Sequence, residues 1–287
     1  MLKQRIATAI VLLIALIAIS TLMSPFWFSL IIAAVVLIAG WEWGGFIGLE
    51  NRTTKVAYLI SLSFLLSCCF FLFEMSPGSD SLRYDRALTL TTMGFLYWVG
   101  SSIVVLSYPT KNKYWNSESR IATMGIFSIV PTWVGITQLK YIATDGVLVL
   151  VLIVLVAAVD VGAFFTGINF GKTKLAPALS PNKTWEGVWG GFALCLLVTI
   201  GFAYFLDQTL VAVGLFEIAV LAVMCFLLTF FSVIGDLLES MLKRNRQIKD
   251  SGKILPGHGG VLDRIDGLIA ATPIFVLFMT YFLVSGR

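Results

Sequence analysis

Long apolar runs alternate with short polar intervals along the whole chain, and this pattern predicts membrane-spanning helices. Nine runs are long and apolar enough to cross a hydrocarbon core of roughly 30 Å. They cover residues 6–23, 26–47, 56–73, 87–106, 121–136, 147–168, 188–206, 210–234 and 268–284. The predicted fold class is therefore all-α, a polytopic integral membrane bundle of about nine transmembrane helices.

Composition supports this fold class and bounds the domain organisation. The 287 residues are 58% hydrophobic and 13% charged, which leaves too little polar surface to cover a soluble core. The polar intervals are also too short to hold a separate soluble domain. We therefore treat residues 1–287 as one membrane domain. Residues 1–140 are expected to form scaffold helices, with possible dimer contacts, and residues 141–287 to form the catalytic helices, since the chemically distinctive side chains come late.

The distribution of cations predicts the orientation. If all nine runs cross, sixteen of the twenty Lys and Arg side chains lie on the same side as the N-terminus. The positive-inside rule then places the N-terminus in the cytoplasm. The expected location is the cell (inner) membrane, with a multi-pass chain whose active site faces the cytoplasm. Cations on that face would attract anionic lipid headgroups and nucleotides, whereas no basic run with interleaved aromatics indicates a nucleic-acid partner.

One stretch, residues 235–267, contains eleven acidic and basic side chains and the single histidine of the chain. Its first part should continue the preceding helix, and there Asp236, Glu239, Ser240 and Lys243 recur every three or four residues and share one face. A solvated helix end with intrahelical ion pairs is the simpler interpretation. Against it, Asp236 lies at the membrane boundary, where an unpaired carboxylate is costly.

The second part of the stretch is a glycine-rich loop around His258 that leads into the last helix. Glycines on both sides let backbone amides turn towards an anion. His258 is expected to donate a hydrogen bond to phosphate, with a role in loop structure as the alternative. Asp263 and Asp266 then share one face of the last helix, or merely complement its dipole. With Asp236 they form an oxygen-only set that favours Mg²⁺.

Two earlier regions also carry candidate chemistry. Asp160 lies inside an apolar run, where a carboxylate needs a polar cavity or a partner; a helix-packing hydrogen bond is the alternative. In the following basic loop, Ser180-Pro181 is typical of a helix N-cap followed by proline at the first position. That helix end, with Lys183, would attract phosphate. Residues 41–43, Trp-Glu-Trp, are expected to be an aromatic belt with one solvated acid.

At these residues the chain resembles the bacterial phosphatidate cytidylyltransferases, also called CDP-diacylglycerol synthases. The family pattern runs from a serine through a Lys-Arg pair and a Lys-Asp pair to His-Gly-Gly and Asp-Arg-apolar-Asp. This chain matches it at Ser240, Lys243, Arg244, Lys249, Asp250, Gly252, Pro256, His258, Gly259, Gly260, Asp263, Arg264 and Asp266. The similarity extends to residues 41–43, 174–177 and 180–187. It departs at two positions. Relatives usually carry Ser or Thr where this chain has Val161, and often carry Tyr where it has Phe164.

The resemblance implies a nine-helix homodimeric enzyme that converts CTP and phosphatidate into CDP-diacylglycerol and diphosphate, using Mg²⁺ and possibly a second, monovalent cation such as K⁺. It implies catalytic roles for Asp236, Lys243, Arg244, Asp263 and Asp266, and metal ligation by the three aspartates. The substrate-binding residues it implies are Asp160, Lys172, Ser180, Lys183, Thr184, Glu186, Ser240, Lys249, Asp250, His258, Gly259, Gly260 and Arg264.

Two other functions fit parts of the pattern. An ion-coupled membrane transporter would use Asp160 and Glu217 as intramembrane ionisable groups. It would also need broken helices in corresponding halves of the chain, and no such symmetry is present. A CDP-alcohol phosphotransferase would need a paired-aspartate helix motif, which this sequence lacks.

Overall fold

The structure is a computed structural model that describes residues 2–110, 114–207, 214–255, 257 and 259–285. Over these residues the chain forms nine helices and one pair of short strands. The helices are α1 (Leu2–Leu22), α2 (Pro25–Ile47), α3 (Arg52–Leu72), α4 (Tyr84–Leu106), α5 (Glu118–Ile142), α6 (Val147–Phe170), α7 (Trp185–Asp207), α8 (Leu215–Arg246) and α9 (Leu262–Ser285); the strands are β1 (Lys174–Ala176) and β2 (Ser180–Thr184).

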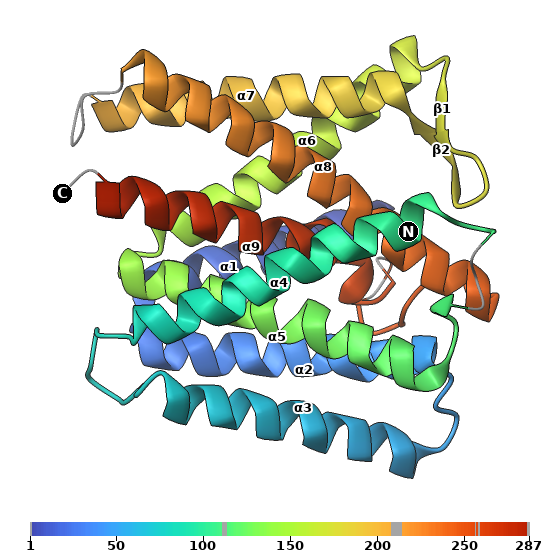
Figure 1. Cartoon of the computed structure of the whole chain (residues 1–287), viewed down its shortest axis with the longest axis horizontal. Coiled ribbons are helices and arrows are strands. Elements are labelled where there is room, and N and C mark those ends of the chain that lie inside the picture. Colours follow the sequence, from blue (N-terminus) through green and yellow to red (C-terminus); the bar gives the residue numbers. More distant parts are fainter. Residues whose placement is uncertain (1, 111–113, 208–213, 256, 258, 286–287) are drawn as a thin grey trace.

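Each of the nine predicted apolar runs corresponds to one helix over the described residues, and the predicted fold class is confirmed. The run predicted at 210–234 begins outside the described residues, and α8 covers it from Leu215 onward. Seven helices, α2 to α8, are long and apolar enough to cross a membrane by length and composition within the described residues. The bundle axis is horizontal in Figure 1, where the two ends of the chain lie at opposite ends of the bundle. That placement agrees with an odd number of crossings. The chain is therefore a multi-pass membrane protein.

The prediction that a helix begins at Ser180-Pro181 is wrong. Ser180 instead starts β2, which pairs antiparallel with β1 through Lys174 opposite Thr184 and Ala176 opposite Ser180. Helix α7 begins only at Trp185, and the Gly187 amide donates to Thr184 Oγ1 at 3.2 Å. Thr184 thus supplies the capping oxygen that was expected from Ser180. The fixed φ of Pro181 suits an extended strand as well as a first helical turn.

Glycines let α6 and α7 approach backbone to backbone. A Cβ on Gly162 would lie 2.5 Å from the carbonyl oxygen of Gly190, and one on Gly191 would lie 2.7 Å from that of Val159. Such small-residue contacts replace the hydrophobic driving force that helices lack inside a bilayer. Helix α6 carries Asp160, and α7 directly follows the β1–β2 hairpin. The close α6–α7 contact therefore fixes the position of Asp160 relative to the hairpin.

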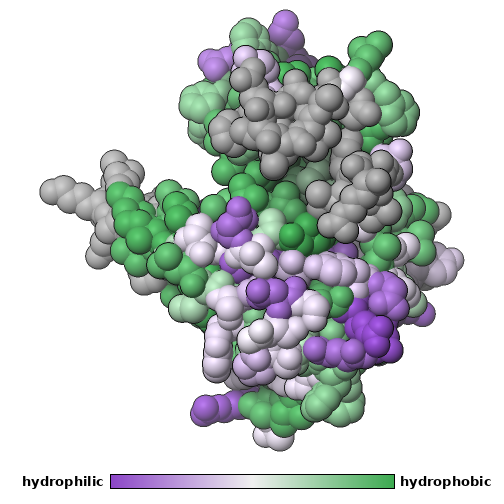
Figure 2. Space-filling view, turned by 90° about the vertical axis from the view of Figure 1, so that its left-hand side faces the viewer, coloured by the Kyte–Doolittle hydropathy of each residue, from purple (hydrophilic) through white to green (hydrophobic). Residues whose placement is uncertain are grey.

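The end of the bundle opposite the hairpin has its own charges. In the segment between α3 and α4, Arg83 Nε contacts Glu74 at 3.0 Å and Arg86 Nη1 contacts it at 3.5 Å. The hydrogen bond from Arg83, aided by the charges of both arginines, lowers the pKa of Glu74. Figure 2 looks onto this end and shows hydrophilic surface bordered by hydrophobic flanks, as expected where a bundle leaves a membrane.

Candidate active site

Helices α8 and α9 cross where their acidic residues lie. A Cβ on Gly235 of α8 would be 2.3 Å from the carbonyl oxygen of Asp266 in α9. Only glycine permits this approach. The contact places Asp236, the next residue of α8, beside the first turn of α9. Gly235, the residue before Asp236, therefore brings two of the three predicted metal ligands, Asp236 and Asp266, to neighbouring positions on α8 and α9.

The first cluster contains Asp236, Asp266 and Lys183. Lys183 Nζ, from the hairpin, contacts Asp236 Oδ2 at 2.5 Å. Burial and, after it, the charge of Asp236 raise the pKa of Asp266 to about 7, so the two carboxylates repel each other electrostatically. Asp160 on α6 is exposed and lies within electrostatic reach of Asp236 and Lys183. Asp160 and Lys183 of the hairpin thus both lie near Asp236 of α8.

The second cluster surrounds Asp263. Its Oδ1 accepts from Lys243 Nζ at 2.8 Å, and its Oδ2 lies 2.9 Å from both the amide and the hydroxyl of Ser251 and 2.8 Å from the Gly260 amide. Burial alone would raise the pKa of Asp263, but these hydrogen bonds and the Lys243 charge outweigh it and lower the pKa. Lys243 also donates to Glu239, which is 4% exposed. Asp263 therefore organises the loop before α9.

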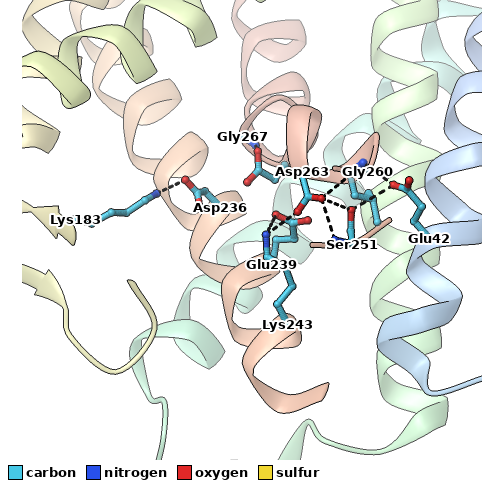
Figure 3. Close-up of polar contacts among 11 residues, drawn as sticks. Glu42, Lys183, Asp236, Glu239, Lys243, Ser251, Gly260, Asp263 and Gly267 are labelled. Atoms are coloured by element: carbon cyan, nitrogen blue, oxygen red, sulfur yellow. Dashed lines mark hydrogen bonds and ion pairs between the residues drawn. The ribbon is translucent and has the colours of Figure 1, made fainter. Parts of the chain in front are cut away.

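Glu42 joins this second cluster, and the expectation of a solvated acid in an aromatic belt is wrong. Its side chain on α2 is 4% exposed. It accepts from the amides of Val261 and Leu262 at 3.1 and 2.9 Å, and Ser251 Oγ lies 3.3 Å away. Figure 3 shows Ser251 between the carboxylates of Glu42 and Asp263. The sequence offered one indication of this role, an acid flanked by Trp41 and Trp43. The same pattern is typical of an aromatic belt at a membrane boundary, so it did not distinguish the two.

Glycines shape the loop around these two carboxylates. A Cβ on Gly252 would lie 2.2 Å from Glu42 Oε1, and one on Gly260 would lie 2.6 Å from Glu42 Oε2. Gly259 has a φ of 83°, a left-handed conformation that favours glycine. The sequence pattern predicted a loop that holds a substrate phosphate. In the structure the amides of Gly260, Val261 and Leu262 donate to the carboxylates of Asp263 and Glu42.

A polar cavity of about 600 Å³ lies between the hairpin and the end of α8. Five of the predicted site residues line it: Ser180, Ser240, Lys243, Arg244 and Lys249. The side chains of Arg244 and Lys249 are exposed, and Arg244 Nε donates to the carbonyl of Leu179 at 3.4 Å. The cavity is therefore open, cationic and adjacent to the acidic clusters.

The remaining predicted residues lie around this centre with different contacts. Glu186 accepts from the amides of Lys172 and Thr173 at 3.1 Å and so closes the base of the hairpin. Asp250 and Arg264 are exposed on either side of the loop. His258, predicted to contact phosphate, lies outside the described residues, as does Pro256.

The acidic residues fit a magnesium site only in part. Among the described residues, no group of three or more His, Cys, Asp or Glu side chains is arranged to hold a metal ion. The pair Asp236 and Asp266 offers oxygen ligands whose mutual repulsion a cation would relieve. Both oxygens of Asp263, by contrast, are already bound by protein donors. Mg²⁺ is usually held by one or two carboxylates together with substrate phosphates, so a two-carboxylate site is chemically sufficient.

Comparison with known proteins agrees with this chemistry. Residues 3–282 match the model of the cytidylyltransferase family. A phosphatidate cytidylyltransferase of Pseudomonas aeruginosa is 39% identical over 279 residues, which cover 97% of each chain. Its counterpart in Haemophilus influenzae is 38% identical over 99% of this chain and all of its own length, and one in Staphylococcus haemolyticus is 33% identical over 80% of this chain and 84% of its own. The chain belongs to the cytidylyltransferase family, together with these bacterial phosphatidate cytidylyltransferases.

Proposed function

We propose that this protein transfers the cytidylyl group of CTP to phosphatidate and releases diphosphate, which makes it a nucleotidyltransferase of phospholipid biosynthesis. The observation that carries the proposal is the polar cavity between the hairpin and α8, which is lined by Lys243, Arg244 and Lys249. Lys243 links it to the carboxylates of Glu239 and Asp263, which Figure 3 shows beside it. Its family membership supplies the reaction class. The transporter hypothesis has no support from either source.

The reaction needs charge neutralisation more than it needs a base. The second pKa of a phosphate monoester is about 6, so the phosphate of phosphatidate is already largely anionic at neutral pH. One of its oxygens attacks the α-phosphorus of CTP, the new P–O bond gives the diphosphate link of CDP-diacylglycerol, and the bond to the β-phosphate breaks. Repulsion between the two anions and the charge on the departing diphosphate form the barrier.

The described cations can lower this barrier from two sides. Arg244 and Lys249 are exposed in the cavity and can bind phosphate oxygens directly. Lys183 is paired with Asp236 and stands on the hairpin, from which it can reach an anion that enters between the hairpin and α8. Lys243 is held by Glu239 and Asp263, so its charge is fixed at the cavity wall.

A divalent cation completes the charge balance in this proposal. Mg²⁺, held by Asp236 and Asp266, would stabilise negative charge on the transferring and leaving phosphates. Asp263 can act as a third ligand only if Lys243 or the loop amides release it, and otherwise it positions the loop. A second, monovalent cation such as K⁺ remains part of the proposal because of the family resemblance alone.

Placement follows from the two substrates. CTP is dissolved in the cytoplasm and phosphatidate is anchored in the bilayer, so we propose that the cavity faces the cytoplasm from the cell (inner) membrane. A homodimer is proposed from the family resemblance, and light scattering of the purified protein tests it.

The decisive test is an assay for a lipid-soluble cytidine product. Purified protein is incubated with labelled CTP, phosphatidate and MgCl₂ in mixed micelles, and the label is expected to enter the organic phase as CDP-diacylglycerol while diphosphate is released. Chelation of divalent cations with EDTA should stop the reaction, and added MgCl₂ should restore it. Absence of product across several lipid compositions would refute the proposed function.

A further inference from the structure

An apolar cavity lies next to the polar one, and nothing in the proposed chemistry uses it. Its volume is about 250 Å³. It is enclosed by the end of α4, the β1–β2 hairpin, the start of α7 and the middle of α8, with Leu175, Leu179, Val188, Phe230, Val233 and Leu237 among its lining residues. Trp185 and Leu106 at its edge are 48% and 71% exposed. The cavity therefore opens sideways, onto the surface that faces lipid.

One face of α8 joins the two cavities. Phe230, Val233 and Leu237 line the apolar cavity, and Ser240, Arg244 and Gln247 line the polar one. These residues follow one another at intervals of three and four, so they form a single stripe along the helix. The stripe changes from apolar to polar between Leu237 and Ser240. At a rise of about 1.5 Å per residue, Val233 at the centre of the apolar part lies roughly 16 Å further along α8 into the bilayer than Arg244.

The hairpin supplies the opposite wall of both cavities. Leu179 is 3% exposed and lines each of them. Its carbonyl accepts the Arg244 hydrogen bond, which fixes this wall against α8 at the junction. The two cavities are thus adjoining halves of one groove, with a cationic half at the end of the bundle and an apolar half towards the membrane.

We propose that the apolar cavity receives an acyl chain of phosphatidate while its phosphate lies in the polar cavity. A ligand that fills both halves must carry an anionic head and an apolar tail, with the tail pointing into the bilayer. CTP cannot occupy the apolar half, since it has no apolar part of that kind. The lateral opening beside Trp185 and Leu106 lets the chain enter directly from the bilayer. This inference rests on the proposed function and identifies where its lipid substrate binds.

The test compares two identical substitutions on one helix. Val233→Phe fills the cavity, whereas Val223→Phe adds the same ring at a position on α8 that is 53% exposed. Each methylene removed from an apolar pocket weakens binding by a factor of about four. Displacement of two methylenes should therefore raise the KM for dioleoyl phosphatidate by about fifteenfold. The KM for CTP should change less than twofold in Val233→Phe, and Val223→Phe should match wild type.

Acyl-chain length distinguishes this site from general damage. With dihexanoyl phosphatidate, whose chains are too short to fill the cavity, Val233→Phe should approach wild-type kinetics. If wild type forms product and Val233→Phe has unchanged kinetics with dioleoyl phosphatidate, the acyl-chain site is wrong and the proposed function stands. If wild type forms no product from either lipid, the proposed function fails first.

Photo-crosslinking tests the same site without a substitution. Phosphatidate with a diazirine in one acyl chain is irradiated with wild-type protein, and labelled peptides are mapped by mass spectrometry. Label should concentrate in residues 174–188 and 228–238 and should decrease when unlabelled phosphatidate competes. Label spread evenly over the lipid-facing helices, including the region of Val223, would mean annular lipid only and would overturn the inference.

Discussion

Two carboxylates, from the buried Glu42 and the partly buried Asp263, hold the loop that leads into α9. Asp263 binds Lys243, Ser251 and the Gly260 amide, and Glu42 binds the two amides that follow. The hydroxyl of Ser251 lies within hydrogen-bond distance of both acids. Because Glu42 comes from α2, the position of the loop depends on a residue more than two hundred positions earlier in the chain. We infer that Glu42 is a positioning residue of the active site.

Glu42→Gln should impair turnover while leaving nucleotide affinity nearly unchanged. A glutamine offers one acceptor oxygen and turns an NH₂ group towards a loop amide, so at least one charge-assisted hydrogen bond is lost. Such bonds contribute about 1.5–3 kcal/mol, and we expect kcat to fall by about tenfold or more with a KM for CTP within twofold of wild type. Steady-state kinetics measure both values. Glu50→Gln, an exposed acid just beyond the same helix, is the matched control, and equal effects of the two variants would contradict the role of Glu42.

Substitution of Asp236 and of Asp263 should affect the magnesium dependence of activity in different ways. Asp236→Asn removes a carboxylate from the pair that fits a cation, so the MgCl₂ concentration for half-maximal activity should rise by about tenfold or more. Asp263→Asn breaks the Lys243 ion pair and loosens the loop; it should abolish most activity at every MgCl₂ concentration while the protein remains folded in detergent. Titration of both variants with MgCl₂ measures this difference. Full activity of Asp263→Asn would exclude both proposed uses of that carboxylate.

The close packing of α6 against α7 positions Asp160 and the hairpin at the site. Gly191→Ala would place a methyl group 2.7 Å from the Val159 carbonyl, so α6 and α7 must separate. Overpacking of this kind costs about 1–3 kcal/mol. We expect a thermal unfolding midpoint several degrees lower, with reduced activity. Gly201→Ala on the same helix has nothing within 4 Å of its new methyl and should leave the midpoint unchanged or slightly raised. Tryptophan fluorescence during heating measures both, and equal midpoints would refute the close helix contact.

The sequence predicted the helices of this fold but not its β1–β2 hairpin. Apolar length alone identifies a membrane helix, so every predicted run corresponds to one helix over the described residues. The hairpin was missed because Ser180-Pro181 satisfies the rules for a helix start, and strands of three and five residues are too short to show a period. Pairing between β1 and β2 is a tertiary choice that local propensity does not contain.

The sequence identified several charged residues that lie near one another in the structure, but it did not predict the contacts of Glu42. A carboxylate near a membrane stands out in the sequence, and Asp160, Lys183, Asp236 and Asp266 do gather in space. Glu42 did not stand out, since an acid between two tryptophans is also typical of a membrane boundary. Its contacts with Val261 and Leu262 depend on how α2 packs, which no local pattern records.

At the scale of the whole molecule, function requires one orientation. The hairpin and the loop before α9 lie at one end of the bundle, and the segment between α3 and α4 lies at the other (Figure 1). The polar cavity belongs to the first end, since the hairpin and the end of α8 line it. Because CTP is dissolved in the cytoplasm, we propose that the first end faces the cytoplasm. The excess of Lys and Arg at that end favours the same orientation, and at the other end Arg83 and Arg86 are paired to Glu74.

Single engineered cysteines measure this orientation directly. Lys253 and Asp80 are both exposed. Lys253 lies in the loop between α8 and α9, and Asp80 lies in the segment between α3 and α4 at the opposite end. In a variant whose four native cysteines are replaced by alanine, we expect Lys253→Cys to react with a membrane-impermeant maleimide only in inverted membrane vesicles. Asp80→Cys should react in intact spheroplasts. Neither residue belongs to the proposed machinery, so cytidylyl transfer should persist in both and show that the labelled protein is folded. The reverse labelling pattern would place the groove away from CTP and would exclude the proposed cytoplasmic active site.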